Sequence, residues 1–246
     1  MGPRTSVREV WAYVGAFLSD MVAANERPLG AAVDVLAEVL RTGGLIYTAG
    51  SGHSLGSVNE TFYRAGGLVP VRPVWAPELF PLNGALRSSE TERTEGIGRR
   101  LIDRSGMGVG DALLVFSNSG VNPVPVEEAA TALERGARVV SVMSTVAQKA
   151  APRRAGQLLQ DVSTVVIDTG VPPGDAYWPR DEPRTAPIST LANVAIWDTI
   201  LAGVLESAPD VPVWSSGNVS GTEGSNGRLA REYSDRIPEL FTGSAV

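Results

Sequence analysis

From residue 45 onward, short apolar runs alternate with segments of helical periodicity, and this alternation limits the folds open to the chain. The apolar runs that we predict to be strands are Leu45–Ala49, Leu68–Val71, Ala112–Phe116, Val139–Met143 and Val162–Ile167. The segments that we predict to be helices are residues 54–65, 92–104, 123–135, 147–159 and 188–206. Strands that alternate with helices are joined by right-handed crossovers and form a mainly parallel sheet. We therefore expect an α/β fold.

Two further helices are predicted before the first strand. Apolar residues recur at helical spacing from Ser6 to about Ala24, and a second stripe begins at Pro28 and ends at Gly43-Gly44. Such a pair of helices can cover a sheet or form a surface between subunits. At the other end, residues 209–226 are rich in Gly, Ser and Pro and are expected to form a long loop before a short helix at Leu229–Ile237.

The composition excludes several classes of protein. Lys and Arg number 21 against 27 Asp and Glu, a net charge of −6, so we expect no nucleic acid as a partner. With no cysteine and one histidine, the chain has no disulfide and no multi-histidine metal centre, and no metal is expected. No stretch approaches the roughly 18–20 apolar residues of a membrane span, and the N-terminus lacks a signal pattern. We therefore expect a cytoplasmic protein that does not bind a membrane.

Two predicted strands run directly into loops of small polar residues. The first strand is followed by Gly50-Ser51-Gly52-His53-Ser54, and the third by Ser117-Asn118-Ser119-Gly120 and then Asn122-Pro123. Glycine lets backbone amides approach a ligand, hydroxyls add donors, and a helix N-terminus adds partial positive charge, so such loops can hold a phosphate without lysine. In a doubly wound sheet of order 2-1-3-4-5, strands 1 and 3 flank the crevice at the topological switch point. The two loops are therefore predicted to face each other across a phosphate site.

Two other interpretations of these loops are weaker. Ordinary turns and helix N-caps also use Ser, Asn and Gly, so either loop alone would be poor evidence. A dinucleotide site is disfavoured because the third glycine is Gly56 rather than residue 55. The second strand also ends in Val71-Arg72-Pro73, without the acidic residue that binds ribose. We expect neither NAD nor FAD, and no other cofactor.

The two loops, on this spacing, resemble the sugar isomerase (SIS) superfamily of phosphosugar isomerases and phosphosugar-binding regulators. Further motifs are similar to a bacterial phosphosugar-binding branch of it: Glu60–Gly67, Asp168–Gly170, Gly174–Ala176, Pro187–Thr190 and Asn218–Gly221. The likeness covers about residues 30–240. It implies a three-layer α/β/α sandwich with a five-stranded parallel sheet of order 2-1-3-4-5, a homodimer or homotetramer, and a sugar phosphate as ligand. It implies no particular reaction, because the superfamily includes isomerases, an etherase and non-catalytic sensors.

The resemblance also implies which residues hold the phosphate. The family pattern places Ser54 of the first loop and Ser117 and Ser119 of the second on the phosphate. Asn122 stands where many members have threonine, and its amide can both donate and accept. The full set of residues that we expect at the phosphate is Ser51, Gly52, Ser54, Ser117, Asn118, Ser119, Gly120 and Asn122.

Within this framework the chain divides into three parts. Residues 1–29 are expected to form an N-terminal helical segment and residues 30–212 the phosphosugar-binding domain. Residues 213–246 are expected to form a C-terminal loop and helix that pack on that domain or on a neighbouring subunit.

Two residues are candidates for the chemistry. An aldose–ketose isomerase needs a base that moves a proton between C1 and C2 and a group that helps open the ring. On a helix over residues 54–65, His53 and Glu60 share one face with Ser57 and Arg64 and lie roughly 10 Å apart along the axis, by the rise per residue. Glu60 is the candidate base and His53 the candidate acid or base. Glu60 and Arg64 also have the spacing of an exposed ion pair, a role that requires no chemistry.

Other polar and aromatic residues are assigned structural roles. Glu127 and Glu128 are expected in the first turn of the helix after Pro123, where they complement its dipole. Tyr63 and Trp75 are expected in the core or in an interface, and Ser189 and Thr190 at a helix N-cap.

One segment departs from the branch that the chain resembles. Members tend to carry a His-Ser-Ser-Gly-Lys-like stretch before the fifth strand, whereas this chain has Arg153-Arg154-Ala155-Gly156-Gln157. The arginines can still contact an anion, in this chain or in a neighbouring subunit.

Taken together, the sequence predicts a protein that binds a phosphorylated sugar. The expected activity is aldose–ketose isomerisation, or a related sugar-phosphate reaction such as β-elimination of an ether substituent, with a carboxylate as the base. The alternative is a non-catalytic phosphosugar sensor that controls a partner.

Overall fold

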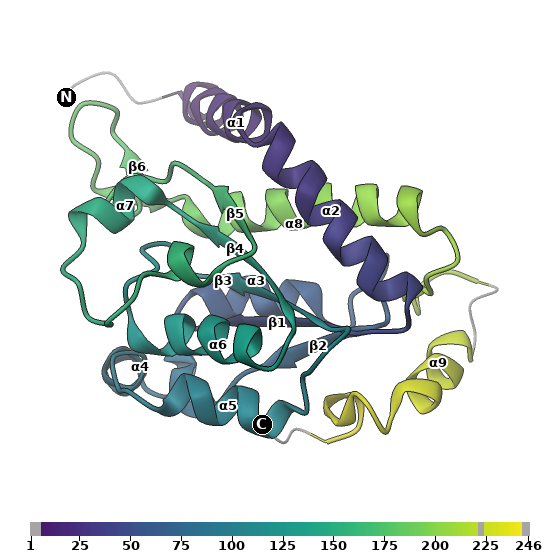
Figure 1. Ribbon diagram of the computed structural model, residues 1–246. Coiled ribbons are helices and arrows are strands. Elements are labelled where there is room, and N and C mark those ends of the chain that lie inside the picture. Colours follow the sequence, from purple (N-terminus) through teal and green to yellow (C-terminus); the bar gives the residue numbers. More distant parts are fainter. Residues whose placement is uncertain (1–5, 221–223, 243–246) are drawn as a thin grey trace.

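A five-stranded parallel sheet forms the centre of the molecule. The computed structural model describes residues 6–220 and 224–242. The strands are β1 (Ile46–Gly50), β2 (Val71–Val74), β3 (Ala112–Phe116), β4 (Arg138–Met143) and β5 (Val165–Asp168). Their order is β2-β1-β3-β4-β5, and every neighbouring pair is parallel (Figure 1). This is the order expected at the sequence level, so the α/β sandwich is confirmed.

Helices cover both faces of the sheet, and two adjacent residues of β1 show how. All five residues of β1 and of β3 are buried, as is usual for strands with helices on both sides. Tyr47 points to one face, where its hydroxyl donates to the carbonyl of Ser105 in α5 (Ile97–Ser105) at 3.4 Å. Thr48 points to the other face, where its hydroxyl lies 2.9 Å from that of Thr61 in α3 (Ser54–Thr61). The three layers follow from this alternation.

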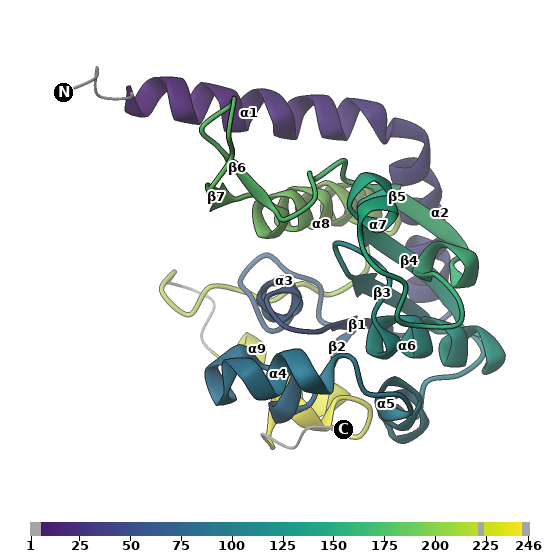
Figure 2. The same ribbon diagram turned by 90° about the vertical axis from the view of Figure 1, so that its left-hand side faces the viewer.

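Figures 1 and 2 show how the α-helices are arranged around the sheet. The α-helices are α1 (Val7–Ala24), α2 (Glu26–Arg41), α3 (Ser54–Thr61), α4 (Ala85–Thr91), α5 (Ile97–Ser105), α6 (Pro123–Glu134), α7 (Thr145–Ala150), α8 (Ser189–Ser207) and α9 (Ser225–Tyr233). The 3₁₀ segments are η1 (Pro77–Leu79), η2 (Pro81–Asn83), η3 (Leu159–Val162) and η4 (Pro238–Leu240). Helices α2, α3 and α8 lie on the Thr48 face, whereas α5 and α6 lie on the Tyr47 face.

Three predicted helices are shorter than expected. The helix over 54–65 ends at Thr61, because Phe62 is extended and Tyr63 has a left-handed φ of 49°. The helix over 92–104 begins only at Ile97, as α5, because α4 has already ended at Thr91 and Gly96, before α5, has a left-handed φ of 80°. The helix over 147–159 is α7 followed by an irregular stretch and η3. In each case the backbone leaves the helical conformation within the predicted range.

Two strand predictions are displaced and one hairpin was not predicted. Leu68 lies outside β2 and instead pairs with Val213 in an isolated antiparallel bridge, and β2 runs through Pro73 because an edge strand tolerates proline. Residues 159–162 form η3, so β5 starts later than predicted. An antiparallel hairpin of β6 (Ala176–Trp178) and β7 (Thr185–Pro187) packs on α1, where the Tyr13 and Tyr177 rings stack at 4.5 Å.

The C-terminal segment packs on its own chain. Leu229 and Ala230 of α9 form a small core with Val69 and Trp214. Glu239 of η4 pairs with Arg72 of β2, and the two side chains are 5% and 11% exposed. Within the described part of the chain, no helix has the length and apolar character needed to cross a membrane.

Candidate phosphate site at the ends of β1 and β3

The structure brings the two small-residue loops together. Strands β1 and β3 are neighbours, with Gly50 opposite Phe116, so the loops that follow them leave the same edge of the sheet side by side. One side chain contacts both: Glu92, the residue after α4, accepts from the Ser51 hydroxyl at 3.1 Å and from the Asn122 side-chain amide at 2.9 Å. The loops therefore lie within the span of a single carboxylate.

The same backbone conformation recurs in both loops. Gly52 and Gly120 each have a φ of 59°, in the left-handed region that favours glycine. At Gly120 space is restricted as well, since a Cβ atom there would lie 2.9 Å from the Cβ of Leu159 in η3. The backbone amide of Gly120 donates a hydrogen bond to the Ser117 hydroxyl oxygen at 3.3 Å. The second loop is therefore a tight turn held against η3.

The second loop keeps free donors, but they come from the loop rather than from the helix after it. The amides of Asn118 and Ser119 find no acceptor among the described residues. In the first turn of α6, Pro123 and Pro125 have no N–H, and the Val124 amide donates to the Glu92 carbonyl at 3.3 Å. The sequence pattern correctly indicated an amide-rich loop, but it overstated the donors that the helix N-terminus supplies.

In the first loop some of the expected donors are already engaged. The Gly52 amide donates to the Leu79 carbonyl at 3.0 Å and the Ser54 amide to the Ser51 carbonyl at 3.1 Å. The Ser54 hydroxyl has no partner among the described residues, and the half-buried Ser54 opens α3. His53 is the N-cap of α3 and is exposed. The donors of this loop without a partner among the described residues include the Ser54 hydroxyl, the His53 imidazole and the backbone amides of Ser51 and His53.

Glu60 lies at the far end of α3 from these loops. Its carboxylate is 2.6 Å from the guanidinium of Arg64, so the expected ion pair forms, although Arg64 follows the end of α3. The Glu60 side chain is 22% exposed and lines an open cavity of about 470 Å³ together with Tyr63, Glu239 and Leu240. Within one chain, Glu60 thus faces the C-terminal segment rather than the loops. Tyr63 is exposed rather than in the core, with its ring 4.7 Å from that of Trp214.

Two residues of the site were not identified from the sequence as its members. Glu92 lies in a run of charged residues, and nothing in the local sequence indicates that it belongs to the site. Its role arises because α4 places it between the two loops. Arg154, in the segment that departs from the branch pattern, donates to the Asn122 side-chain oxygen at 3.0 Å. One arginine of that segment therefore reaches the second loop of its own chain.

Several motif residues have structural roles. The Asp168 carboxylate accepts from the Thr145 and Gly170 amides at 3.0 and 3.1 Å and so closes the turn after β5. Asp175 accepts from the Ile188 and Ser189 amides at 3.0 and 2.7 Å and from the Ser189 hydroxyl, which caps α8. Asn218 lies in the turn before α9, and Gly221 of the same motif lies outside the described residues.

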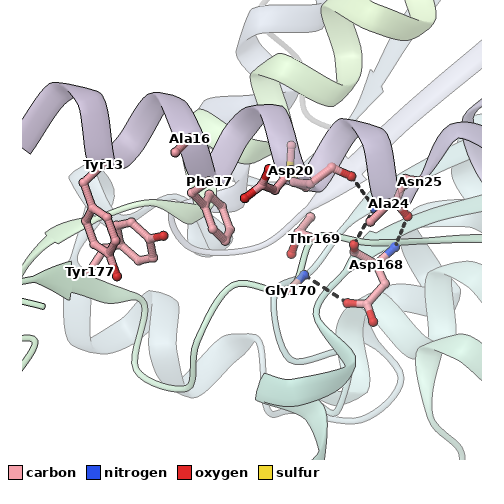
Figure 3. Close-up of a pocket in the computed structure, with 11 residues that line it drawn as sticks. Tyr13, Ala16, Phe17, Asp20, Ala24, Asn25, Asp168, Thr169, Gly170 and Tyr177 are labelled. Carbon is pink, nitrogen blue, oxygen red and sulfur yellow. Dashed lines mark hydrogen bonds between the residues drawn. The ribbon is translucent and has the colours of Figure 1, made fainter. Parts of the chain in front are cut away.

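A second cavity lies at the end of β5, below α1. It has a volume of about 480 Å³, and Tyr13, Phe17, Asp20, Asp168 and Tyr177 are among the residues that line it (Figure 3). Figure 3 shows that the amide of Asn25 and the carboxylate of Asp168 are both engaged in hydrogen bonds. The cavity is separate from the two loops, which follow β1 and β3.

One carboxyl group is buried without a partner. Glu128 is fully buried on α6, and neither of its oxygens has a hydrogen-bond partner among the described residues. Burial raises the pKa of Glu128 well above its usual value, and the nearby Glu127 raises it further. Glu127 itself accepts from the Gly96 and Gly98 amides at 2.6 and 3.0 Å. Because α6 starts at Pro123, both residues lie in its second turn, so the expected dipole role at the first turn is wrong.

Comparison with known proteins agrees with this architecture. A family model described as a SIS domain matches residues 11–144. The chain belongs to the SIS domain family. Within that family it is similar to the UPF0309 protein of Geobacillus kaustophilus (strain HTA426). The two are 35% identical over 233 residues, which cover 91% of this chain and 93% of that protein.

Two solved structures show the same fold at low sequence identity. Phosphoheptose isomerase GmhA from Neisseria gonorrhoeae is 19% identical with a TM-score of 0.51, and the match covers 80% of this chain and 96% of that one. The Vibrio vulnificus NanR protein, complexed with ManNAc-6P, is 15% identical with a TM-score of 0.51, and the match covers 97% of this chain and 71% of that one. The resemblance drawn from the two loops is therefore confirmed at the level of family and fold.

Proposed function

We propose that the chain binds a sugar phosphate at the two loops and catalyses its aldose–ketose isomerisation. The observation that carries this proposal is the meeting of two hydroxyl-bearing loops at the ends of β1 and β3, close enough for Glu92 to contact both. The free amides of Asn118 and Ser119, with the hydroxyls of Ser54, Ser117 and Ser119, suit the oxygens of a phosphate. The similarity to a phosphoheptose isomerase supports the same ligand class.

The proposed isomerisation requires a carboxylate that transfers a proton between two carbon atoms. After the ring opens, with His53 as the proposed acid or base, the carboxylate removes the proton from C2 of the aldose and returns it to C1. One hydroxyl proton moves from O2 to O1, so the ketose has the same atoms as the aldose. Glu60 is the proposed base, and a lyase reaction that eliminates an ether substituent would use the same carboxylate.

The alternative is a non-catalytic sensor of phosphosugars. It is favoured by the position of Glu60, whose carboxylate is paired with Arg64 and lies away from the loops within one chain. The isomerase and the sensor share the phosphate site and differ in whether a base reaches C2.

We also propose that the protein is a homodimer or homotetramer. Figure 2 shows α1 extending past the body of the molecule toward the N-terminus. Near its start, Val7 and Trp11 are 84% and 67% exposed, which leaves large apolar side chains for a second copy to cover. Analytical ultracentrifugation measures the assembly directly, and a monomer at micromolar concentration would contradict this proposal.

A thermal-shift screen with phosphorylated hexoses, pentoses and amino sugars tests the binding. We expect hexose 6-phosphates to raise the melting temperature and the phosphate-free sugars to do so much less. Replacing Ser117 and Ser119 together by Ala should abolish the shift, while replacing Ser234, the half-buried residue after α9, by Ala should leave it unchanged. An unchanged shift in the double variant would place the ligand elsewhere.

Solvent deuterium incorporation at C2 then separates the two functions. With the best-binding sugar phosphate, an isomerase incorporates deuterium, and Glu60→Gln should abolish turnover while it retains binding. The exposed Glu95→Gln variant is the matched control and should retain both. Tight binding without any incorporation would favour the sensor.

A further inference from the structure

A negatively charged side chain lies among the donors proposed for the phosphate. The Glu92 carboxylate accepts from Ser51 with one oxygen and from Asn122 with the other. Both donors belong to the set expected at the phosphate. Glu92 therefore occupies the place where the two loops approach each other.

The charge of Glu92 is not neutralised by an ion pair. Among the described residues, no arginine, lysine or histidine nitrogen lies within salt-bridge distance of its carboxylate. Arg154 reaches it only through the Asn122 amide, which accepts from Arg154 and donates to Glu92. An anion that binds beside Glu92 therefore meets a like charge at short range.

The donors and the charge divide the site into two halves. On the second loop, the free amides of Asn118 and Ser119 and the nearby Arg154 favour an anion. Between the two loops, Glu92 offers carboxylate oxygens, which can only accept hydrogen bonds. Sugar hydroxyls donate hydrogen bonds, whereas the oxygens of a phosphate dianion are mainly acceptors.

We infer that Glu92 determines specificity: it accepts hydrogen bonds from the hydroxyls of the sugar and disfavours free phosphate. The inference rests on the proposed function, since it concerns the ligand of the same loops. Inorganic phosphate meets the repulsion of Glu92 and can donate to it only from the P–OH groups of the charged group itself. A sugar phosphate meets the same repulsion but also forms hydrogen bonds to a charged acceptor, which are the stronger kind.

Glutamine is a suitable replacement at this position. Glu92→Gln has the same shape without the charge, and its oxygen can still accept from Asn122 while its NH₂ group donates to the Ser51 hydroxyl. The Glu92→Asp variant retains the charge but is too short to reach both loops. Glu90→Gln changes an exposed residue of α4, the helix that Glu92 follows, and is the control.

The experiment measures affinity by calorimetry for inorganic phosphate and for the best-binding hexose 6-phosphate, at constant ionic strength. In the wild type we expect the sugar phosphate to bind at least 100-fold more tightly than inorganic phosphate. Glu92→Gln should reduce that ratio at least tenfold, in part because its affinity for inorganic phosphate rises. Glu92→Asp should bind inorganic phosphate as weakly as the wild type, and Glu90→Gln should retain the wild-type ratio.

The outcomes separate this inference from the proposed function. If the wild type binds hexose 6-phosphates and Glu92→Gln leaves the ratio unchanged, the inference is wrong and the proposed function stands. If neither the wild type nor any variant binds a sugar phosphate, the proposed function fails and the inference fails with it. Melting curves without ligand show whether each variant is folded, and a folded Glu92→Asp protein tests the role of the charge even if Glu92→Gln does not fold.

Discussion

Asn25 and Asp168 form two reciprocal hydrogen bonds across 143 positions of the chain. The Asn25 amide donates to the Asp168 carbonyl at 2.7 Å, and the Asp168 amide donates to the Asn25 side-chain oxygen at 3.0 Å. Because β5 is an edge strand, its outer backbone groups have no neighbouring strand. The side chain of Asn25, buried between α1 and α2, takes the place of that strand for one residue.

Replacing Asn25 should therefore destabilise the protein. Asn25→Leu leaves the amide and carbonyl of Asp168 without their partner, which costs roughly 2–4 kcal/mol. Asn25→Asp retains an acceptor but loses the donor and should cost less than Asn25→Leu. Urea denaturation measures both changes in the free energy of unfolding, and the exposed Asn83→Leu provides the control. Equal stability of Asn25→Leu and wild type would contradict this role.

The two loop glycines should respond differently to alanine. Both have a φ of 59°, so alanine costs about 1–2 kcal/mol at either position from backbone strain alone. At Gly120 the new Cβ would also lie 2.9 Å from the Leu159 Cβ, whereas at Gly52 the nearest atom is a Glu92 oxygen at 3.5 Å. We expect Gly120→Ala to lose roughly 2–4 kcal/mol of unfolding free energy and Gly52→Ala about half as much. Equal losses in urea denaturation would show that η3 does not restrict Gly120.

The buried Glu128 carboxyl should make stability fall as the pH rises. Burial raises its pKa in the folded state above the usual 4.5, so above that value the unfolded chain releases a proton that the native state retains. The native state then binds more protons than the unfolded state, and the free energy of unfolding decreases with pH by up to about 1.4 kcal/mol per unit. The contribution is fully present below pH 4.5 and is lost as the pH rises toward the folded-state pKa.

Glu128→Gln removes this titration and should flatten the dependence of stability on pH above 4.5. Denaturation at a series of pH values measures the slope for wild type and variant. Glu134→Gln, an exposed change on the same helix, should leave the slope as it is in the wild type. Identical slopes for wild type and Glu128→Gln would mean that Glu128 is ionised in the folded state.

The pair of Arg72 and Glu239 should hold the C-terminal segment to the sheet edge. The Arg72 guanidinium donates to both carboxylate oxygens at 2.9–3.2 Å and also to the Ser105 carbonyl at 2.6 Å. Removing either partner leaves the other charge buried and unpaired. Arg72→Met and Glu239→Leu should therefore each lower the free energy of unfolding by roughly 3–5 kcal/mol. The double variant should cost clearly less than the sum. A double-mutant cycle measures this coupling, and additive losses would show that the ion pair is not coupled.

The fold could be predicted from the sequence because its strands are short, apolar and separated by helical patterns. The two loops could be predicted as well, because Ser, Gly and Asn directly follow the buried strands β1 and β3. Local pattern failed where the backbone turns inside a predicted helix, as at Tyr63 and Gly96. It also failed at Glu92, whose partners Ser51 and Asn122 lie 41 and 30 positions away. Such contacts arise only when separate elements pack together, and the residue type alone does not reveal them.

The backbone of Glu92 is fastened to α6 independently of its side chain. Its carbonyl accepts the hydrogen bond of the Val124 amide at 3.3 Å, so a change of the Glu92 rotamer does not disturb this main-chain contact. Side-chain rotamers change on a picosecond-to-nanosecond timescale, whereas the opening of a larger element takes microseconds to milliseconds. Adjustment of Glu92 to the hydroxyls of an incoming sugar would therefore not limit how fast this protein captures its ligand.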